Sequence, residues 1–288
     1  PLTEFIKKDL VPAMLSWQVV VRAEDKFMLD GVQMSFSKEA LQHMTNIRDL
    51  SVGPANPVVL HYVKGLALGR LTDVELTARL FLLENFLVRQ ILGGRAMSPL
   101  RARLMDLMGA IDEDYSIEKL RSSLFASDWV TDAELLKEVT THSLYESGTP
   151  KSIGAIFRGI ERQLSGAGYM QFVIGNSDGT YSIEHIYPQK NSKWLEDLKV
   201  WSADPNEMDK RVHALGNLTV VTKGHNSSVG NKTFHDKQSY PTVEGHAAPL
   251  GVNKDWLSSD CEQWTPAAID KRSIKLLNAA LNYWVDIS

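Results

Sequence analysis

The spacing of the apolar residues changes at a Ser-Gly-Ala-Gly sequence over residues 165–168, and this change divides the chain into two predicted parts. After it, apolar and β-branched runs are short and bounded by turn residues, which is typical of strands. Before it, apolar residues recur every three or four positions, the period of an α-helix, as in Leu76, Leu80, Leu83, Leu87 and Ile91. We therefore expect a mostly helical α+β protein, with an α-helical region over residues 1–166 and a second domain over 167–288.

Local helix signals support the helical assignment of the first part. Thr72–Glu75 and Thr131–Glu134 have the form of a capping box, Gly93-Gly94 is a stop signal, and Ser98-Pro99 puts proline at a first helical position. Further helices are expected near residues 3–20, 38–50, 57–68, 116–124 and 151–164. The first part is thus predicted to be an all-α bundle.

The second part combines short strands with a terminal helix. Residues 169–174 and 180–183 flank a turn-rich cluster, which predicts a β-hairpin, and residues 218–222 are another strand candidate. Thr265-Pro266 marks the start of a C-terminal helix that runs to about residue 285. The stretch 238–264 lacks periodicity and is expected to be an irregular loop.

Composition limits the classes of function. One cysteine, Cys261, excludes an internal disulfide and a cysteine-based zinc site. The chain has 31 basic and 35 acidic residues, so any nucleic-acid contact must use a local basic surface. No apolar run approaches the roughly 20 residues that span a bilayer, so we expect no membrane partner. The single cysteine favours a cytoplasmic protein. The start at Pro1, without an initiator methionine, suggests a piece of a longer chain.

Side chains capable of chemistry are concentrated between residues 184 and 237. They form three blocks, Glu184–Gln189, Leu215–Val221 and His225–Lys237. The blocks read Glu-His-Ile-x-Pro-Gln, then Leu-Gly-Asn-Leu-Thr, then Asn-x-x-x-x-Asn-x-x-Phe-x-x-Lys. Four of the eight histidines lie in this segment: His185, His213, His225 and His235.

The three blocks, in this order and spacing, resemble the C-terminal HNH nuclease domain of GmrSD-type modification-dependent restriction endonucleases. Proteins that sense DNA phosphorothioation and restrict phage are similar, so the resemblance implies a prokaryotic protein. The resemblance implies a ββα-metal fold in the second domain and a metal-dependent, nickase-like endonuclease that acts on double-stranded DNA. It also implies an upstream nucleotide-hydrolysing domain, absent from this sequence, that controls the activity. No Gly-x-x-x-x-Gly-Lys-[Ser/Thr] phosphate loop occurs here.

The resemblance assigns His185, Asn217 and Asn226 to catalysis. Hydrolysis of a phosphodiester needs a deprotonated water and a cation that neutralises charge on the leaving side. An imidazole with an ordinary pKa near 6.5 is largely neutral at pH 7 and can accept the proton, which is the role assigned to His185. Asn217 is expected to hydrogen-bond backbone across the loop and so hold His185 in place.

Glu184 and Asn226 are the expected metal ligands, because Mg²⁺ or Mn²⁺ prefers oxygen donors. Lys232 and Lys237 are expected to contact DNA phosphates. Asn231 and His225 are assigned supporting roles, and His225 is an alternative ligand. Neighbouring strand residues point to opposite faces, so Glu184 and His185 share a site only if the strand ends or bulges there.

Other interpretations remain open at this stage. The domain could be a catalytically degenerate DNA- or partner-binding module of the same defence system, a scaffold whose helices dock a partner, or a nuclease that acts on RNA. His213 and His235 are expected to be solvated. Trp194 and Trp201 are expected to pack in the core rather than to stack on bases.

Overall fold

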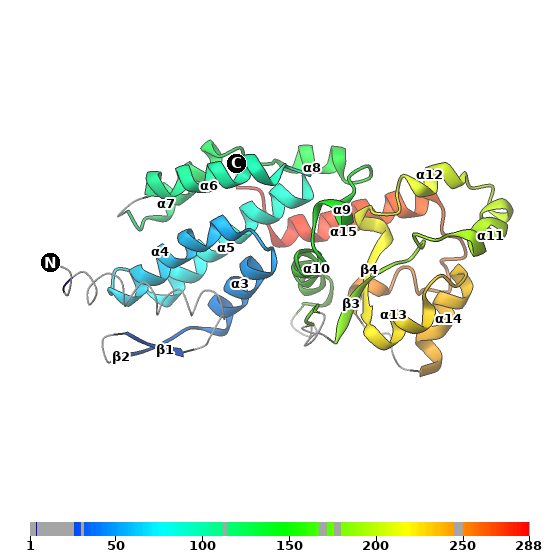
Figure 1. The fold of residues 1–288 in the computed structure, drawn as a ribbon, viewed down its shortest axis with the longest axis horizontal. Coiled ribbons are helices and arrows are strands. Elements are labelled where there is room, and N and C mark those ends of the chain that lie inside the picture. Colours follow the sequence, from blue (N-terminus) through cyan, green and yellow to red (C-terminus); the bar gives the residue numbers. More distant parts are fainter. Residues whose placement is uncertain are drawn as a thin grey trace. The chain divides into compact units, whose positions relative to one another are not determined.

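The computed structural model describes Glu4 and residues 26–29, 32–111, 114–166, 172–175, 180–244 and 250–287. The chain divides into two compact units: residues up to Gln90 together with 95–130, and residues 91–94 together with 131–287 (Figure 1). The second unit therefore takes over the chain after Val130, and it includes the last helix predicted for the first part, near residues 151–164, together with the strands that follow. The domain boundary at residues 166/167 stays a prediction.

The first unit is built mainly from helices with the predicted signals. Thr72 and Glu75 bond each other's main-chain N–H groups at 3.3 and 2.8 Å, so the first predicted capping box is present. The elements of this unit are β1 (Lys26–Leu29), β2 (Val32–Ser35), α3 (Lys38–Asp49), η2 (Gly53–Ala55), α4 (Asn56–Ala67), α5 (Asp73–Leu92), α6 (Met97–Ile111) and α7 (Ile117–Ala126).

The prediction of an all-α first part is wrong, because β1 and β2 form an antiparallel pair. The two residues between the strands are Asp30-Gly31, a pair that favours two-residue hairpin links. The hairpin signal is confined to these few residues, and helices were expected on either side of it in the sequence, near residues 3–20 and 38–50. The predicted helix over residues 3–20 lies outside the described residues except for Glu4.

The second unit surrounds one strand pair with helices. Thr131 and Glu134 complete the second predicted capping box, and Thr265 caps the C-terminal helix as expected. The elements are α8 (Asp132–Glu138), α9 (Leu144–Ser147), α10 (Pro150–Ser165), β3 (Tyr181–His185), η4 (Ser192–Trp194), α11 (Leu195–Val200), α12 (Pro205–Asp209), η5 (Leu215–Asn217), β4 (Leu218–Thr222), α13 (Lys223–Val229), α14 (Phe234–Glu244), η6 (Gly251–Asn253) and α15 (Pro266–Tyr283).

β3 pairs with β4 rather than with the segment predicted as its hairpin partner. The pair is antiparallel, from Tyr181 opposite Thr222 to His185 opposite Leu218. Part of the predicted first strand, 169–171, lies outside the described residues, and Ile174 makes only an isolated parallel bridge to Tyr181. A distant partner wins because 218–222 offers a continuous, largely buried β-branched run.

The core of the second unit is rich in aromatic residues. Trp194 is fully buried and Trp201 packs against the same cluster, which confirms the core assignment of these two residues. Helix α14 occupies the start of the stretch that was expected to be irregular, and this expectation is therefore wrong for residues 238–244. Phe234, at the first turn of α14, packs on Trp264 with ring centroids 5.6 Å apart.

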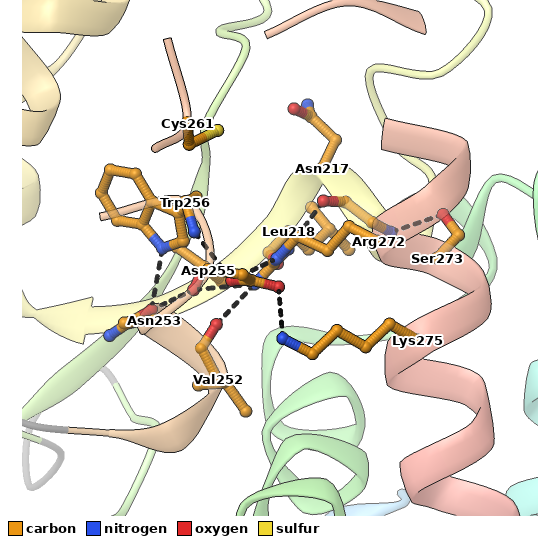
Figure 2. Close-up of polar contacts among 12 residues, drawn as sticks. Asn217, Leu218, Val252, Asn253, Asp255, Trp256, Cys261, Arg272, Ser273 and Lys275 are labelled. Carbon is orange, nitrogen blue, oxygen red and sulfur yellow. Dashed lines mark hydrogen bonds and ion pairs between the residues drawn. The ribbon is translucent and has the colours of Figure 1, made fainter. Parts of the chain in front are cut away.

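Arg272 of α15 ties the chain around β4 together (Figure 2). Its side chain is 4% exposed, and its guanidinium pairs with Asp255 at 3.2 Å. Lys275 lies 3.5 Å from the other oxygen of Asp255. The guanidinium also donates at 2.6–2.8 Å to three main-chain oxygens, those of Gly216, Leu218 and Val252.

Gly216 allows this close approach. A Cβ at this position would lie 2.1 Å from the main-chain oxygen of Ile269 in α15, which no side chain tolerates. The turn η5 and the start of β4 are therefore fixed against α15 directly, and this arrangement sets the position of Asn217.

Candidate functional site

His185 ends β3 and its ring lies against two other aromatic rings. Its Nε2 is 3.1 Å from Nδ1 of His213. The ring of Tyr145 stands edge-on to the His185 ring, with centroids 4.5 Å apart, and stacks on His213 at 5.5 Å. His185 is only 8% exposed. The three rings hold the imidazole in one orientation.

The hydrogen-bond partners define which nitrogen of His185 is available. Oε1 of Glu146 lies 3.6 Å from Nε2 of His213, so an N–H at that position of His213 faces a carboxylate. In the neutral ring, Nδ1 of His213 is then an acceptor, and Nε2–H of His185 donates to it. Nδ1 of His185 therefore carries the lone pair. The amide nitrogen of Gln189, which only donates, lies 3.5 Å from the same Nε2 and would bond it only in the other tautomer, so the shorter contact to His213 carries the assignment.

The surroundings of His185 keep it neutral. Burial, together with the neighbouring His213 and Lys237, lowers the pKa of His185 to about 3. The ring is therefore neutral at pH 7, which is the form that can accept a proton. A negatively charged group that approached the ring would raise this pKa and strengthen the base.

Glu184 lies on the other side of the strand and forms a buried ion pair. Nζ of Lys237, from α14, is 2.6 Å from Oε1 of Glu184 and 2.8 Å from the carbonyl oxygen of His185. Burial raises the pKa of Glu184 and lowers that of Lys237, and the attraction between the two opposes both shifts. Pairing with β4 continues to His185, so no bulge turns Glu184 towards the His185 ring.

The expectation that Lys237 contacts DNA phosphate is not met by this structure. The side chain is 1% exposed and its ammonium bonds Glu184 and the main chain of His185. An ammonium this deeply buried needs a counter-charge, which explains the contact. Lys237 instead links α14 to the end of β3 through its bonds to Glu184 and to the carbonyl oxygen of His185.

Asn217 has the hydrogen bonds that the sequence predicted for it. Its Nδ2 donates to the carbonyl oxygens of Tyr187 and Val212, both at 2.8 Å. Its Oδ1 accepts from the main-chain N–H of Tyr187 at 2.8 Å and from Nε1 of Trp264 at 3.0 Å. The main-chain oxygen of Asn217 accepts from Ile186. The backbone that leaves His185 is thereby clamped.

Asn226 is half-buried in α13 and faces β3. Its Nδ2 donates to Oγ of Ser182 at 2.9 Å and to the carbonyl oxygen of Ile183 at 3.2 Å. A carbonyl only accepts, so the nitrogen must point to the strand and Oδ1 points away from it. Ser182 shares a strand face with Glu184, two residues along.

The structure thus brings the predicted residues together in two groups. Glu184, Lys237 and Asn226 share one face of β3, whereas His185 turns to His213 and Tyr145. Within the described residues, no hydrogen bond joins His185 to Asn226. Asn231 is exposed in the turn after α13, and Lys232 lies beside it, with its carbonyl oxygen bonded by Trp194. The His225 side chain lies outside the described residues.

Oxygen donors on the Glu184 face suit a hard divalent cation. Oδ1 of Asn226 makes no hydrogen bond to the described residues, whereas the carboxylate of Glu184 already accepts from Lys237 and from the main-chain N–H of His185. Both groups offer oxygens of the kind that Mg²⁺ prefers. No group of three or more His, Cys, Asp or Glu side chains gathers for a metal in the described part of the chain.

The chain matches a family described as GmrSD restriction endonucleases, C-terminal domain, over residues 129–279, which is more than half of its length. The chain belongs to this family. No curated protein and no solved structure matches it.

Membership in the GmrSD family indicates a nuclease of the restriction endonuclease type with DNA as its substrate. The GmrSD domain also includes α8, α9 and α10, so Tyr145 and Glu146 fall inside it together with all predicted site residues. Across the described residues, no helix has the length and apolar content needed to cross a membrane.

Sequence reasoning missed three residues of the site. His213 was expected to be solvated, and this is wrong, because its imidazole is mostly buried against His185. Tyr145 and Glu146 lie about forty residues before His185 in the sequence, in the four-residue helix α9. No local pattern could have placed α9 here, since the contact depends on the main-chain bond from Tyr145 to His213.

Proposed function

We propose that the second unit is an HNH endonuclease of the ββα-metal type that uses Mg²⁺ or Mn²⁺ to nick double-stranded DNA, with His185 as general base. The observation that carries the proposal is the imidazole of His185, held through Nε2 by His213 at a strand end whose following turn is clamped by Asn217. Such a ring keeps Nδ1 without a proton, as a general base requires.

The order of elements supports the ββα-metal assignment. β3 pairs antiparallel with β4 after an intervening segment of η4, α11, α12 and η5, and β4 runs directly into α13 (Figure 1). Asn226 of that helix bonds back to β3. The motif residues therefore come from both strands and the helix of one small substructure.

In this proposal, Nδ1 of His185 takes a proton from the attacking water. The phosphate that approaches brings negative charge, which raises the pKa of His185 when the proton is transferred. His213 keeps the ring in its tautomer, and Asn217 keeps the turn rigid. A bound Mg²⁺ or Mn²⁺, held by Glu184 and Asn226, would neutralise charge on the phosphate oxygens.

The wider role rests on the family. One site of this kind hydrolyses one strand in each event, so nicks are the expected product. We further propose that the full protein restricts modified phage DNA and that an N-terminal nucleotide-hydrolysing domain controls the nuclease.

Supercoiled plasmid provides the test. The 288-residue chain should convert it to the open-circular form with Mg²⁺ or Mn²⁺, and EDTA should stop the reaction. His185→Ala should lower the rate at least 100-fold, consistent with loss of a general base. His235→Ala, a change at an exposed histidine of α14, is the matched control. Equal rates for the His185 variant and the wild type would refute the proposal.

A second candidate is a catalytically degenerate DNA- or partner-binding module. The buried pairing of Glu184 with Lys237 favours it, because the carboxylate already has a cation. This candidate predicts DNA binding without nicking under any divalent metal, and no change in binding for His185→Ala.

A further inference from the structure

His142 lies two residues before α9, the four-residue helix that brings Tyr145 and Glu146 to the His185 site. Nε2 of His142 is 3.0 Å from Oγ of Ser147, the last residue of α9. The side chain of His142 therefore reaches from the start of the helix to its end. A helix this short is not stable by itself, so contacts with its surroundings decide where it lies.

The His142 ring also rests on residues 91–94, the end of α5 and the two glycines that follow, which belong to the second unit. The carbonyl oxygen of Ile91 accepts a hydrogen bond from the ring. Gly94 has a φ of +62°, and a Cβ at this position would lie 2.8 Å from two atoms of the His142 ring. Glycine is therefore required here both by the backbone conformation and by the close approach.

The neutral form of His142 suits both contacts. Burial lowers the pKa of His142, and the bond to Ile91 and the nearby Glu138 oppose this shift. A neutral imidazole has one N–H, which the Ile91 carbonyl takes, and one lone pair, which can accept from the Ser147 hydroxyl. The ring thus links the end of α5 to α9.

From α9 the contacts continue to both imidazoles of the candidate site. The main-chain N–H of Tyr145 donates to the carbonyl oxygen of His213 at 3.2 Å, and the Tyr145 ring meets His185 edge-on. The carboxylate of Glu146 lies 3.6 Å from Nε2 of His213. The position of α9 therefore affects the orientation of the His185 ring and the tautomer that His213 imposes on it.

We propose that His142 is a positioning residue for His185 and acts on it through α9. The proposal rests on the proposed endonuclease function, since it explains how the general base is kept in its reactive tautomer. Without the His142 ring, α9 shifts and Glu146 no longer faces His213. The Nε2–H and Nδ1–H forms of His185 then become similar in population, and only the first has a lone pair on Nδ1.

The test compares His142→Ala with the wild type in steady-state plasmid nicking and in ¹⁵N NMR of the His185 ring. The kcat should fall about 10-fold with an unchanged KM, because the tautomer of the base affects proton transfer and not DNA binding. The ring signals should change from the Nε2–H form to a mixture. His142→Gln, whose amide both donates and accepts, should recover most of the kcat.

Thr141→Ala, a change at the exposed neighbour of His142, is the matched control and should leave kcat, KM and the ring signals unchanged. A thermal melt checks that His142→Ala folds. Unchanged ring signals or an unchanged kcat in the folded variant would overturn the proposal. An equal loss in His142→Gln would also overturn it, because the ring would then serve packing alone.

A milder variant serves if His142→Ala does not fold. Ser147→Ala, at an exposed position of α9, removes the hydroxyl that the His142 ring contacts and should lower the kcat about 3-fold. An unchanged kcat and unchanged His185 signals in Ser147→Ala would then decide against the proposal.

The NMR result is independent of the nicking assay. A His185→Ala chain that nicks as fast as the wild type would refute the endonuclease mechanism and leave the tautomer result standing. Wild-type ring signals and kcat in folded His142→Ala, with nicking lost in His185→Ala, would refute the role of His142 alone.

Discussion

Asn217 and Asn226 flank the same strand, β4, yet the structure uses them in opposite ways. Asn217 is fully buried, and its side chain donates two hydrogen bonds and accepts two, all with protein partners. Asn226 is half-buried and bonds the described residues through its nitrogen alone, so its oxygen can serve a ligand. The remaining hydrogen-bonding capacity, rather than the residue type, separates a residue that builds the site from one that acts in it.

The same contrast divides the rest of the second unit. The anchored half, which we define as Asn217, Arg272 and Lys237, has its charges and amides satisfied by protein. Glu184 belongs to both halves, because it pairs with Lys237 and is also a proposed metal ligand. The open half, defined as His185, His213 and Asn226, keeps a nitrogen and an oxygen available. Changes in the anchored half should therefore reduce stability, and changes in the open half should reduce activity.

Lys237→Met should have the largest effect on stability. It leaves the Glu184 carboxylate buried without its cation, which should lower the free energy of unfolding by about 4 kcal/mol. Burial then raises the pKa of Glu184 further, so the carboxyl binds a proton more readily in the folded state than in the unfolded state. The deficit should shrink as the pH falls from 8 to 4. Urea unfolding at both pH values measures it.

The matched control adds Glu184→Gln to the same chain. Removing both charges should restore most of the lost stability. A loss below about 1 kcal/mol for Lys237→Met would show that the pair does not anchor β3.

Asn217→Ala should have the next largest effect and lower the free energy of unfolding by about 3 kcal/mol. The change removes four hydrogen bonds and leaves buried main-chain groups of Tyr187 without partners. Asn217→Asp is the informative comparison, since it keeps the acceptor and loses the two donated bonds. Denaturant midpoints of the two variants give the answer. Wild-type stability in the alanine variant would remove Asn217 from the anchored half.

His213→Ala should lower the single-turnover nicking rate about 30-fold, or about 2 kcal/mol of activation free energy, because His185 loses the group that fixes its tautomer. In the folded variant, the ¹⁵N NMR signals of the His185 ring should then show a mixture of tautomers. His213→Asn, which offers an acceptor in a similar place, should recover part of the rate. A normal rate in His213→Ala would assign His213 to packing only.

Asn226→Ala should have the smallest effect on stability, about 1 kcal/mol, since only two partly exposed bonds are lost. Thermal unfolding of this variant beside Asn217→Ala tests the comparison directly. Equal losses in the two variants would contradict the division into halves.

Much of the fold followed from local sequence signals. The capping boxes at Thr72 and Thr131, the helix start at Thr265 and the strand at 218–222 all lie where their patterns predicted. These signals act over a few residues, so they need no knowledge of tertiary structure. The β1–β2 pair and the pairing of β3 with β4 escaped prediction, because strand partners are chosen by contacts across the fold.

The candidate site shows the same limit. The hydrogen bonds of Asn217 were expected, because the resemblance of the Leu-Gly-Asn-Leu-Thr block to the GmrSD family assigned this residue to backbone contacts across the loop. The buried position of Lys237 was not, since an exposed-looking lysine in a polar segment gives no sign of the carboxylate it meets. His213 belongs to none of the three motif blocks, and its position depends on stacking with the ring of Tyr145, which is distant in the sequence.

The most direct measurement of the central claim is chemical rescue of a chain without its base. His185→Gly should nick plasmid at least 100-fold more slowly than the wild type, and added imidazole should restore part of the rate in proportion to the neutral form of imidazole. The same imidazole should leave the His235→Gly control unchanged. Nicking by His185→Gly at the wild-type rate, with or without imidazole, would contradict the assignment of His185 as the general base.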